Sequence, residues 1–599
     1  MTGTIAFVLA VLFAAAILFI TEKLRPDLVA LLVLTVFGVS GILTPTEALS
    51  GFSRPAVITI LAIFILTAAL EKTGVTRTLG AWLVRLGGRA EGQMLVVLML
   101  SGALLSLFMN NIAAGAVLLP VAVGIASERK ISPGKLMMPL AFGTLLGGMA
   151  TLLTTVNILV SSSLRDNGLP GFELLDFLPI GIPAVLVGVV YMLLLGRRLL
   201  PRRAPSDWQR LMQAARGPLE DIYGLRERWM HALVPVTSPL VGRTLAQAGL
   251  GRELGVNVIA IIEDGKSRLA PPPGEYLHAG DLLFMQARSE QVELLTRRGL
   301  EIQSASGVLN PLNSESIGLF ELALAPRSGA LGKTVRDIHF REKYGLSVVA
   351  IWREGRPRRV GVGEMPLQQG DALLVLGPRQ GIHVLQSEPE FIVLSGESDQ
   401  PLRRSKGLWV VAIMAAAMVL SALGVLQIAE AMLAGALGMV LVGALTMDEA
   451  YQAIEWKVIF LIAGMLPAGV AMIKTGTAAL VANLIVAALG AWTPLVVLAG
   501  LMVVALVLTQ VMSGQATIVI LAPIAISAAQ QVHADARTFS LGVALACSMA
   551  FLTPLGHPVN ILVMGPGGYK FGDYFRVGLL LCLLLLATFL LLLPLEYGL

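Results

Sequence analysis

The chain has 599 residues, of which 56% are hydrophobic and only 14% are charged. This composition excludes a soluble globular protein and a disordered chain, and it indicates a polytopic membrane protein. The formal net charge is +5 and the two cysteines, Cys547 and Cys582, both lie in apolar runs, so no disulfide framework is predicted.

The first part of the chain contains apolar segments that are long enough to cross a membrane. They lie near residues 4–20, 27–43, 55–71 and 177–196. Basic residues follow the last of them and also open the second apolar region: Arg197, Arg198, Arg202, Arg203, Arg403, Arg404 and Lys406. Such clusters favour the cytoplasmic side of a cell membrane. Counting an unpaired first helix and five crossings in each half, we expect a cytoplasmic N-terminus and an external C-terminus.

The apolar stretch at residues 94–126 is interrupted by a polar pair. At about 33 residues, it is too long for one crossing and too short for two. We therefore predict a re-entrant hairpin with Asn110 and Asn111 at its tip. The oxygen of a side-chain amide can bind a cation, and its N–H groups can donate hydrogen bonds to an anion. The alternative interpretation is that this pair forms hydrogen bonds between packed helices and binds no ligand.

A second interruption, at residues 147–157, combines two glycines with three threonines and an asparagine. The polar residues are Thr151, Thr154, Thr155 and Asn157. This pattern permits local unwinding, which is tolerable at membrane depth only around a cavity lined by protein. The freed carbonyl groups and hydroxyls predict a site for a monovalent cation.

Residues 218–397 are polar and contain a repeat with an offset of 90 residues. Ser238 to Leu245 parallels Ser328 to Val335, and Gly280-Asp281 parallels Gly370-Asp371. This repeat resembles the C-terminal (RCK-C) domain of TrkA-type potassium-uptake regulators, in tandem. The resemblance implies a cytoplasmic regulatory module, and related modules bind small ligands such as cyclic dinucleotides.

The ligand of this module is left open, because a dimerising domain without a ligand fits equally well. Arg243 and Lys333 occupy matching positions where they could meet a phosphate, but each could also be a solvated charge. No Gly-x-Gly-x-x-Gly motif follows a strand, so NAD binding is not predicted.

The second apolar region repeats the first. Lys72-Thr73-Gly74 returns as Lys474-Thr475-Gly476, 402 residues later, and Val156-Asn157-Ile158 returns as Val559-Asn560-Ile561, 403 residues later. The second hairpin tip is Ser513-Gly514-Gln515-Ala516-Thr517, and the second unwound segment runs from Thr553 through His557 to Asn560. Two related halves with interruptions at matching places are typical of a secondary transporter with inverted repeats.

The segment from Pro554 to Tyr569, followed by Asp573, has the most specific pattern in the chain. It resembles the divalent-anion/sodium symporter family of the ion transporter superfamily, including members with tandem TrkA C-terminal domains between the halves. The resemblance implies hairpin tips and unwound helices that hold sodium, with the anion between them, and a homodimer. The second tip departs from the pattern because it lacks an asparagine, which leaves Gln515 as a substitute.

These arguments assign two overlapping sets of site residues. The anion set is Asn110, Asn111, Thr155, Asn157, Ser513, Gly514, Gln515, Thr517, His557 and Asn560. The sodium set is Asn110, Thr151, Thr154, Asn157, Ser513, Thr553 and Asn560. Protonation of His557 would make transport pH-sensitive, although a neutral structural role is the favoured interpretation.

We therefore expect a polytopic α-helical membrane protein with inverted repeats and re-entrant hairpins, carrying an inserted α+β tandem of cytoplasmic RCK-C domains. The expected parts are a transmembrane half at 1–203, a first RCK-C domain with its linker at 204–310, a second at 311–402, and a second transmembrane half at 403–599.

The favoured function is sodium-coupled symport of a small divalent anion in the inner membrane. Sulfate is favoured over di- and tricarboxylates, with membrane lipid as a further partner and no nucleic acid. An ion channel gated by the RCK-C domains is the alternative, but no potassium-filter motif is present. No nucleophile triad, metal-ligand spacing or phosphate loop indicates an enzyme.

Overall fold

The computed structural model divides the chain into two compact units, Met1–Pro205 with Leu402–Leu599, and Ser206–Pro401. The structure describes residues 3–21, 23–85, 90–129, 131–201, 223, 229–250, 253–254, 256–263, 266–269, 271–272, 274–287, 291–303, 317–324, 328–353, 356–359, 361–368, 371–386, 390–393, 403–489 and 493–598. Gly370 of the predicted repeat lies outside the described residues.

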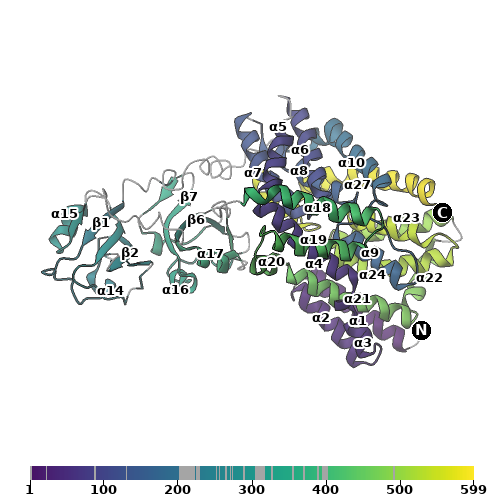
Figure 1. Ribbon diagram of the computed structural model, residues 1–599, viewed down its shortest axis with the longest axis horizontal. Helices are drawn as coiled ribbons and strands as arrows, with labels where there is room; N and C mark the ends of the chain where they lie inside the picture. Colours follow the sequence, from purple (N-terminus) through teal and green to yellow (C-terminus); the bar gives the residue numbers. More distant parts are fainter. Residues whose placement is uncertain are drawn as a thin grey trace. The chain divides into compact units, whose positions relative to one another are not determined.

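The first unit is helical, and its two halves contain the same succession of helices (Figure 1). The first half consists of α1 (Gly3–Thr21), α2 (Pro26–Val39), α3 (Pro45–Leu49), α4 (Pro55–Lys72), α5 (Val75–Arg85), α6 (Glu91–Ser106), α7 (Asn111–Glu128), α8 (Met137–Gly148), α9 (Thr155–Asp166) and α10 (Leu178–Tyr191). Proline in the first turn begins α2, α3 and α4, where a missing N–H leaves no helical hydrogen bond unmade.

The second half consists of α18 (Gly407–Ala422), α19 (Ile428–Leu441), α20 (Met447–Ala453), α21 (Trp456–Lys474), α22 (Thr477–Leu489), α23 (Pro494–Thr509), α24 (Gly514–Gln531), α25 (Ala536–Cys547), α26 (Pro558–Gly567) and α27 (Phe571–Tyr597). Among the described residues, six helical segments are long and apolar enough to cross a membrane. Three belong to each half and occupy matching places: α1, α3–α4 and α10, then α18, α21 and α27.

Two reciprocal ion pairs show that equivalent helices run in opposite directions. Lys72 at the end of α4 pairs with Glu449 in α20 at 3.2 Å, and Lys474 at the end of α21 pairs with Glu47 in α3 at 2.7 Å. Each helix therefore ends where the other begins. Arg403, at the start of the second half, also donates to Glu449 at 2.8 Å.

The predicted unpaired first helix is wrong, because α18 precedes α19 as α1 precedes α2. Each half then has five elements that correspond one to one: α1, α2, α4, α8–α9 and α10 in the first half, and α18, α19, α21, α25–α26 and α27 in the second.

The second unit contains two antiparallel five-stranded sheets with the same topology. The first is built from β1 (Trp229–Leu233), β2 (Asn257–Glu263), β3 (Lys266–Leu269), β4 (Leu282–Gln286) and β5 (Glu301–Gln303), in the order β3-β2-β4-β1-β5. The second is built from β6 (Ile317–Leu324), β7 (Ser347–Arg353), β8 (Arg356–Arg358), β9 (Ala372–Pro378) and β10 (Phe391–Val393), in the order β10-β6-β9-β7-β8. The two orders are equivalent strand by strand.

Details of the two sheets also match at the 90-residue offset. Register shifts fall between Val258 and Ala260 and between Val348 and Ala350. Short helices accompany the sheets: α14 (Leu245–Ala248), α15 (Val292–Arg297), α16 (Phe340–Tyr344) and α17 (Arg379–Gln386). The predicted duplication of the insert is therefore confirmed.

One hydrophobic cluster joins the two sheets within this unit. Its members from the first sheet are Ile259, Ala260 and Phe284, and those from the second are Val349, Ala350, Leu374 and Leu376, together with Tyr223. His231 and Glu321 hold equivalent positions on β1 and β6, and both are buried. Tyr223 donates a hydrogen bond to Glu321, whose pKa is raised by burial.

Acidification should weaken the first sheet through His231. Burial lowers the pKa of this imidazole below its usual 6.5, so the unfolded chain takes up the proton first as the pH falls. Stability is then fully present above pH 6.5 and is lost below it, by at most about 1.4 kcal/mol per pH unit. Hydrogen exchange of β1 and β4 in the full-length protein should be faster at pH 5.5 than at pH 7.5, after correction for intrinsic rates.

His231→Phe should remove this pH dependence, because phenylalanine fills the space without a proton to gain. His278→Gln, at an exposed histidine, is the matched control and should retain it. Equal pH dependence in the wild type and the His231→Phe variant would contradict the assignment.

Candidate functional site

The four interruptions of the membrane unit lie beside helices that contact helices of the other half. The hairpin tips are residues 107–110, between α6 and α7, and residues 510–513, between α23 and α24. The unwound segments are residues 149–154, between α8 and α9, and residues 548–557, between α25 and α26. Helix α9 contacts α24 and α25 of the other half, and α26 contacts α7 and α8.

Close glycine contacts confirm this exchange between the halves. A Cβ atom on Gly115 of α7 would lie 2.6 Å from Val559 Cγ2 of α26. On the other side Val156 of α9, the counterpart of Val559, lies against Gly514 of α24, with 3.3 Å between the added Cβ and Val156 Cγ2. Each unwound segment therefore leads into a helix that packs on the hairpin of the other half.

The first hairpin tip reaches the first unwound segment through Asn111. A Cβ on Gly148 would lie only 2.5 Å from Asn111 Oδ1, which also accepts a hydrogen bond from the Ser106 hydroxyl. Asn110 instead accepts from the backbone N–H of Ile112 at 3.1 Å, as a local cap of α7. Of the predicted pair, Asn111 is thus the residue placed against the unwound segment.

Asn157 ties the first unwound segment together. Its Nδ2 donates to the carbonyl oxygens of Thr151 at 2.7 Å and Gly148 at 3.5 Å, while its Oδ1 has no partner among the described residues. The buried hydroxyls of Thr151 and Thr154 also lack partners there. Thr155 begins α9. Because buried polar atoms are almost always paired, three such oxygens at one break indicate a place for a ligand.

At the second hairpin tip the predicted residues form the start of α24. The exposed Ser513 is the N-cap, and its Oγ accepts from the N–H of Ala516 at 3.3 Å. The buried Thr517 donates its hydroxyl to the Ser513 carbonyl at 3.0 Å. Gly514 and Gln515 occupy the first turn and are both half-buried.

The second unwound segment repeats the bracing of the first through Asn560. Its Nδ2 donates to the carbonyl of Ala550 at 2.7 Å and to that of Thr553 at 3.3 Å, and its Oδ1 lacks a partner among the described residues. His557 is the N-cap of α26, with Nδ1 accepting from Val559 N–H at 3.2 Å. This contact gives His557 a structural role.

Two polar residues where α23 meets the second tip, Thr509 and Gln510, were missed by the sequence analysis. Thr509 donates its hydroxyl to the Cys547 carbonyl at 2.9 Å, and Gln510 bonds to the unwound segment at Met549 and Leu552. The signal was available, since both are polar residues at the end of an otherwise apolar run.

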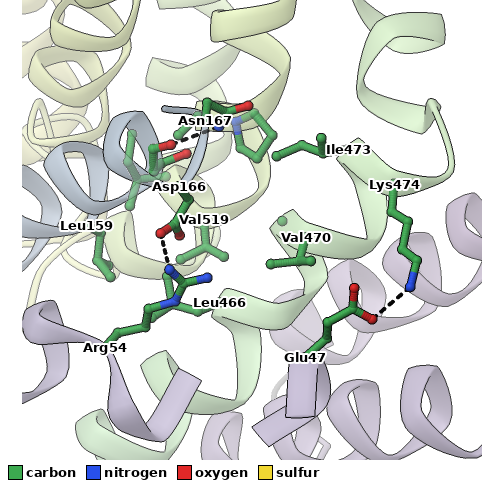
Figure 2. A pocket seen from close by; sticks show the side chains of 15 residues that line it. Glu47, Arg54, Leu159, Asp166, Asn167, Leu466, Val470, Ile473, Lys474 and Val519 are labelled. Atoms are coloured by element: carbon green, nitrogen blue, oxygen red, sulfur yellow. Dashed lines mark hydrogen bonds and ion pairs between the residues drawn. The ribbon is translucent and has the colours of Figure 1, made fainter. Parts of the chain in front are cut away.

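A separate cavity of about 300 Å³ lies between α3, α4 and α21 on one side and α9 and α24 on the other. Figure 2 shows two ion pairs in it, Arg54 with Asp166 and Lys474 with Glu47. None of the predicted anion or sodium residues lines this cavity. Its four charges are already paired with one another.

In the insert, Arg243 and Lys333 hold equivalent exposed positions in the turns before α14 and α16. Glu263, His278 and Asp281 place one potential metal-ligand atom each within 4.8 Å of one another. Glu263 and His278 are about half exposed, however, and Glu263 also lies 3.9 Å from the Arg268 guanidinium. We therefore do not assign a metal site to Glu263, His278 and Asp281.

Comparison with known proteins places the chain among transporters. A family model described as CitMHS, citrate transporter, matches residues 16–543. The chain belongs to this citrate transporter family. It is 35% identical to the uncharacterised transporter sll0640 of Synechocystis, over 99% of this chain and 97% of that protein. It is 33% identical to the uncharacterised transporter YfbS of Escherichia coli over the whole of both.

A further relative is the probable sodium/sulfate cotransporter 3 of Chlamydomonas reinhardtii. The two are 28% identical over 58% of this chain and 40% of that protein. The GsuK RCK domain matches 26% of this chain and 63% of that chain at 13% identity, with a TM-score of 0.14 that is too low to assign the fold. The protein is thus a membrane transporter and not an enzyme, as predicted.

Proposed function

We propose that this protein is a sodium-coupled symporter of a small divalent anion, with sulfate favoured over di- and tricarboxylates. The observation that carries this proposal is the set of three unpartnered buried oxygens at the first unwound segment, on Thr151, Thr154 and Asn157. Hydroxyl and amide oxygens are hard acceptors that suit a small cation.

The anion would bind between the hairpin tips. Helices α7, α9, α24 and α26 all begin at the interruptions, and helix N-termini present free N–H groups with positive dipole character. Residues 106–115, 147–157, 510–517 and 550–560 contain no lysine or arginine. An anion held by neutral donors alone favours sulfate, which is fully ionised and rich in acceptor oxygens.

The antiparallel relation of α4 and α21 supports alternating access by inverted repeats. With the insert in the cytoplasm, as the basic flanks indicate, both termini would be external. We propose a homodimer in the inner membrane whose contacts come from residues 27–71 and 428–473. The insert contains none of the four interruptions and would regulate transport by favouring one conformation through a small ligand.

Uptake by proteoliposomes tests the proposed function. An inward sodium gradient should raise the accumulation of radiolabelled sulfate at least tenfold over a matched potassium gradient, and unlabelled citrate or succinate should compete weakly. Stronger competition by citrate than by sulfate would reverse the order of substrates. Flux that neither saturates nor requires sodium would contradict symport and favour the channel alternative.

A further inference from the structure

The two unwound segments differ in the oxygens they leave free. At the first, the unpartnered buried oxygens belong to Thr151, Thr154 and Asn157. The Asn560 amide donates to the carbonyls of Thr553 and Ala550 as the Asn157 amide donates to those of Thr151 and Gly148, so Thr553 is the counterpart of Thr151. The Thr553 hydroxyl already donates to the Gln510 carbonyl and accepts from Gly556 N–H, and Nδ1 of His557, 403 positions after Thr154, accepts the N–H of Val559. Of these three residues, Asn560 alone retains an unpartnered buried oxygen among the described residues.

The side-chain amide of Gln510 forms hydrogen bonds with the backbone of the second unwound segment. Its Nε2 donates to the carbonyl oxygens of Met549 at 2.9 Å and Leu506 at 3.0 Å, and its Oε1 accepts from Leu552 N–H at 3.0 Å. Its main-chain oxygen accepts the Thr553 hydroxyl at 2.9 Å. Gln510 is 6% exposed, so these bonds form away from solvent.

The first half has no equivalent of this bracing amide. The residue 403 positions before Gln510 is Leu107, whose side chain can neither donate nor accept a hydrogen bond. A primary amide supplies two donors, and a donor and a cation compete for the same carbonyl lone pairs. At the second segment the Gln510 amide adds a donor to those of Asn560, whereas at the first segment the Asn157 amide is the one side-chain amide donor among the described residues.

We propose that the Gln510 amide takes the place of a cation at the second unwound segment, so that each protomer binds one coupling cation, at the first segment. This inference rests on the proposed cation coupling and refines it. Thr553 and Asn560 then brace the second segment and do not bind the cation, which narrows the sodium set predicted from the sequence. Gln510 acts as a positioning residue.

Equilibrium binding of radioactive sodium to the full-length protein in lipid nanodiscs tests the stoichiometry. One sodium ion per protomer is expected, and Thr151→Val with Thr154→Val should weaken its binding at least tenfold. Thr588→Val, where the hydroxyl bonds only its own helix at Leu584, should leave the affinity within twofold of wild type. Two sodium ions per protomer would overturn the inference and leave symport intact, whereas no sodium binding would remove the proposed coupling itself.

Gln510→Glu separates cation replacement from simple packing. The two side chains have the same shape, but the carboxylate replaces the amide donors by a charged acceptor facing the Met549 carbonyl. The variant should bind two sodium ions per protomer, which a merely structural role for residue 510 would not produce. A well-folded Gln510→Glu protein that still binds one ion would overturn the inference. If this variant does not fold, Gln510→Met should bind one ion with unchanged affinity, and a loss of sodium binding there would overturn it.

Discussion

Asn157→Ala should strongly weaken sodium-driven uptake while the protein still inserts into the membrane. The change removes the unpartnered Oδ1 and strips the Thr151 and Gly148 carbonyls of their shared donor. Each buried group left unpaired costs about 1–3 kcal/mol, and 1.4 kcal/mol corresponds to a tenfold change in affinity. Sodium affinity should therefore fall by about 10-fold to 100-fold, measured as the sodium concentration for half-maximal uptake.

The matched control is Asn483→Ala, at an exposed asparagine of α22, which should transport like the wild type. Asn157→Asp retains an acceptor and should lose less sodium affinity than the alanine variant. Unchanged sodium dependence in a well-folded Asn157→Ala protein would return this residue to a packing role and remove the site from the first unwound segment.

Gly147→Ala should strongly destabilise the fold, because α8 packs on α6 at backbone distance. A Cβ on Gly147 would lie 2.2 Å from the carbonyl oxygen of Ala103, and one on Gly143, a turn earlier, would lie 2.4 Å from that of Met99. Backbone atoms of a packed helix cannot move aside as a flexible side chain can. Overpacking costs typically about 1–3 kcal/mol, and this contact belongs at or above the top of that range.

The readout for this variant is the melting temperature and the monodisperse fraction of purified protein in detergent. Gly572→Ala is the control, since a Cβ there meets nothing within 4 Å. Alanine exceeds glycine in helix propensity by about 1 kcal/mol, so the control should be neutral or slightly stabilised. A Gly147→Ala protein as stable as the wild type would show that α6 and α8 do not approach so closely.

Some of the site could be predicted because polar residues in apolar sequence have few roles. Asn157 and Asn560 stood out by their matching places in the two halves, and the structure buries both fully at equivalent breaks. The role of Gln510 could not be predicted in this way. It has no polar counterpart in the first half, and its partners Met549 and Leu552 lie about 40 residues further along the chain.

The correspondence of α1 with α18 was also missed in the sequence analysis. Hydropathy identifies apolar segments one at a time, so the pairing of α1 with α18 depended on a count that a single helix can change. The reciprocal ion pairs of Lys72 with Glu449 and Lys474 with Glu47 fix the antiparallel relation, and they join residues 377 and 427 positions apart.

The sequence by itself determined that this protein is a duplicated membrane transporter with a duplicated soluble insert. Repeats, hydropathy and helix-breaking residues are properties of the amino-acid sequence itself and do not depend on which segments the fold brings together. Only the tertiary structure decided which carbonyls and hydroxyls remain unpartnered at the two unwound segments. Whether a buried oxygen accepts a hydrogen bond depends on the donors that the fold brings within about 3 Å of it. The Met549 carbonyl oxygen accepts from the Gln510 amide, whereas Asn157 Oδ1 has no donor among the described residues.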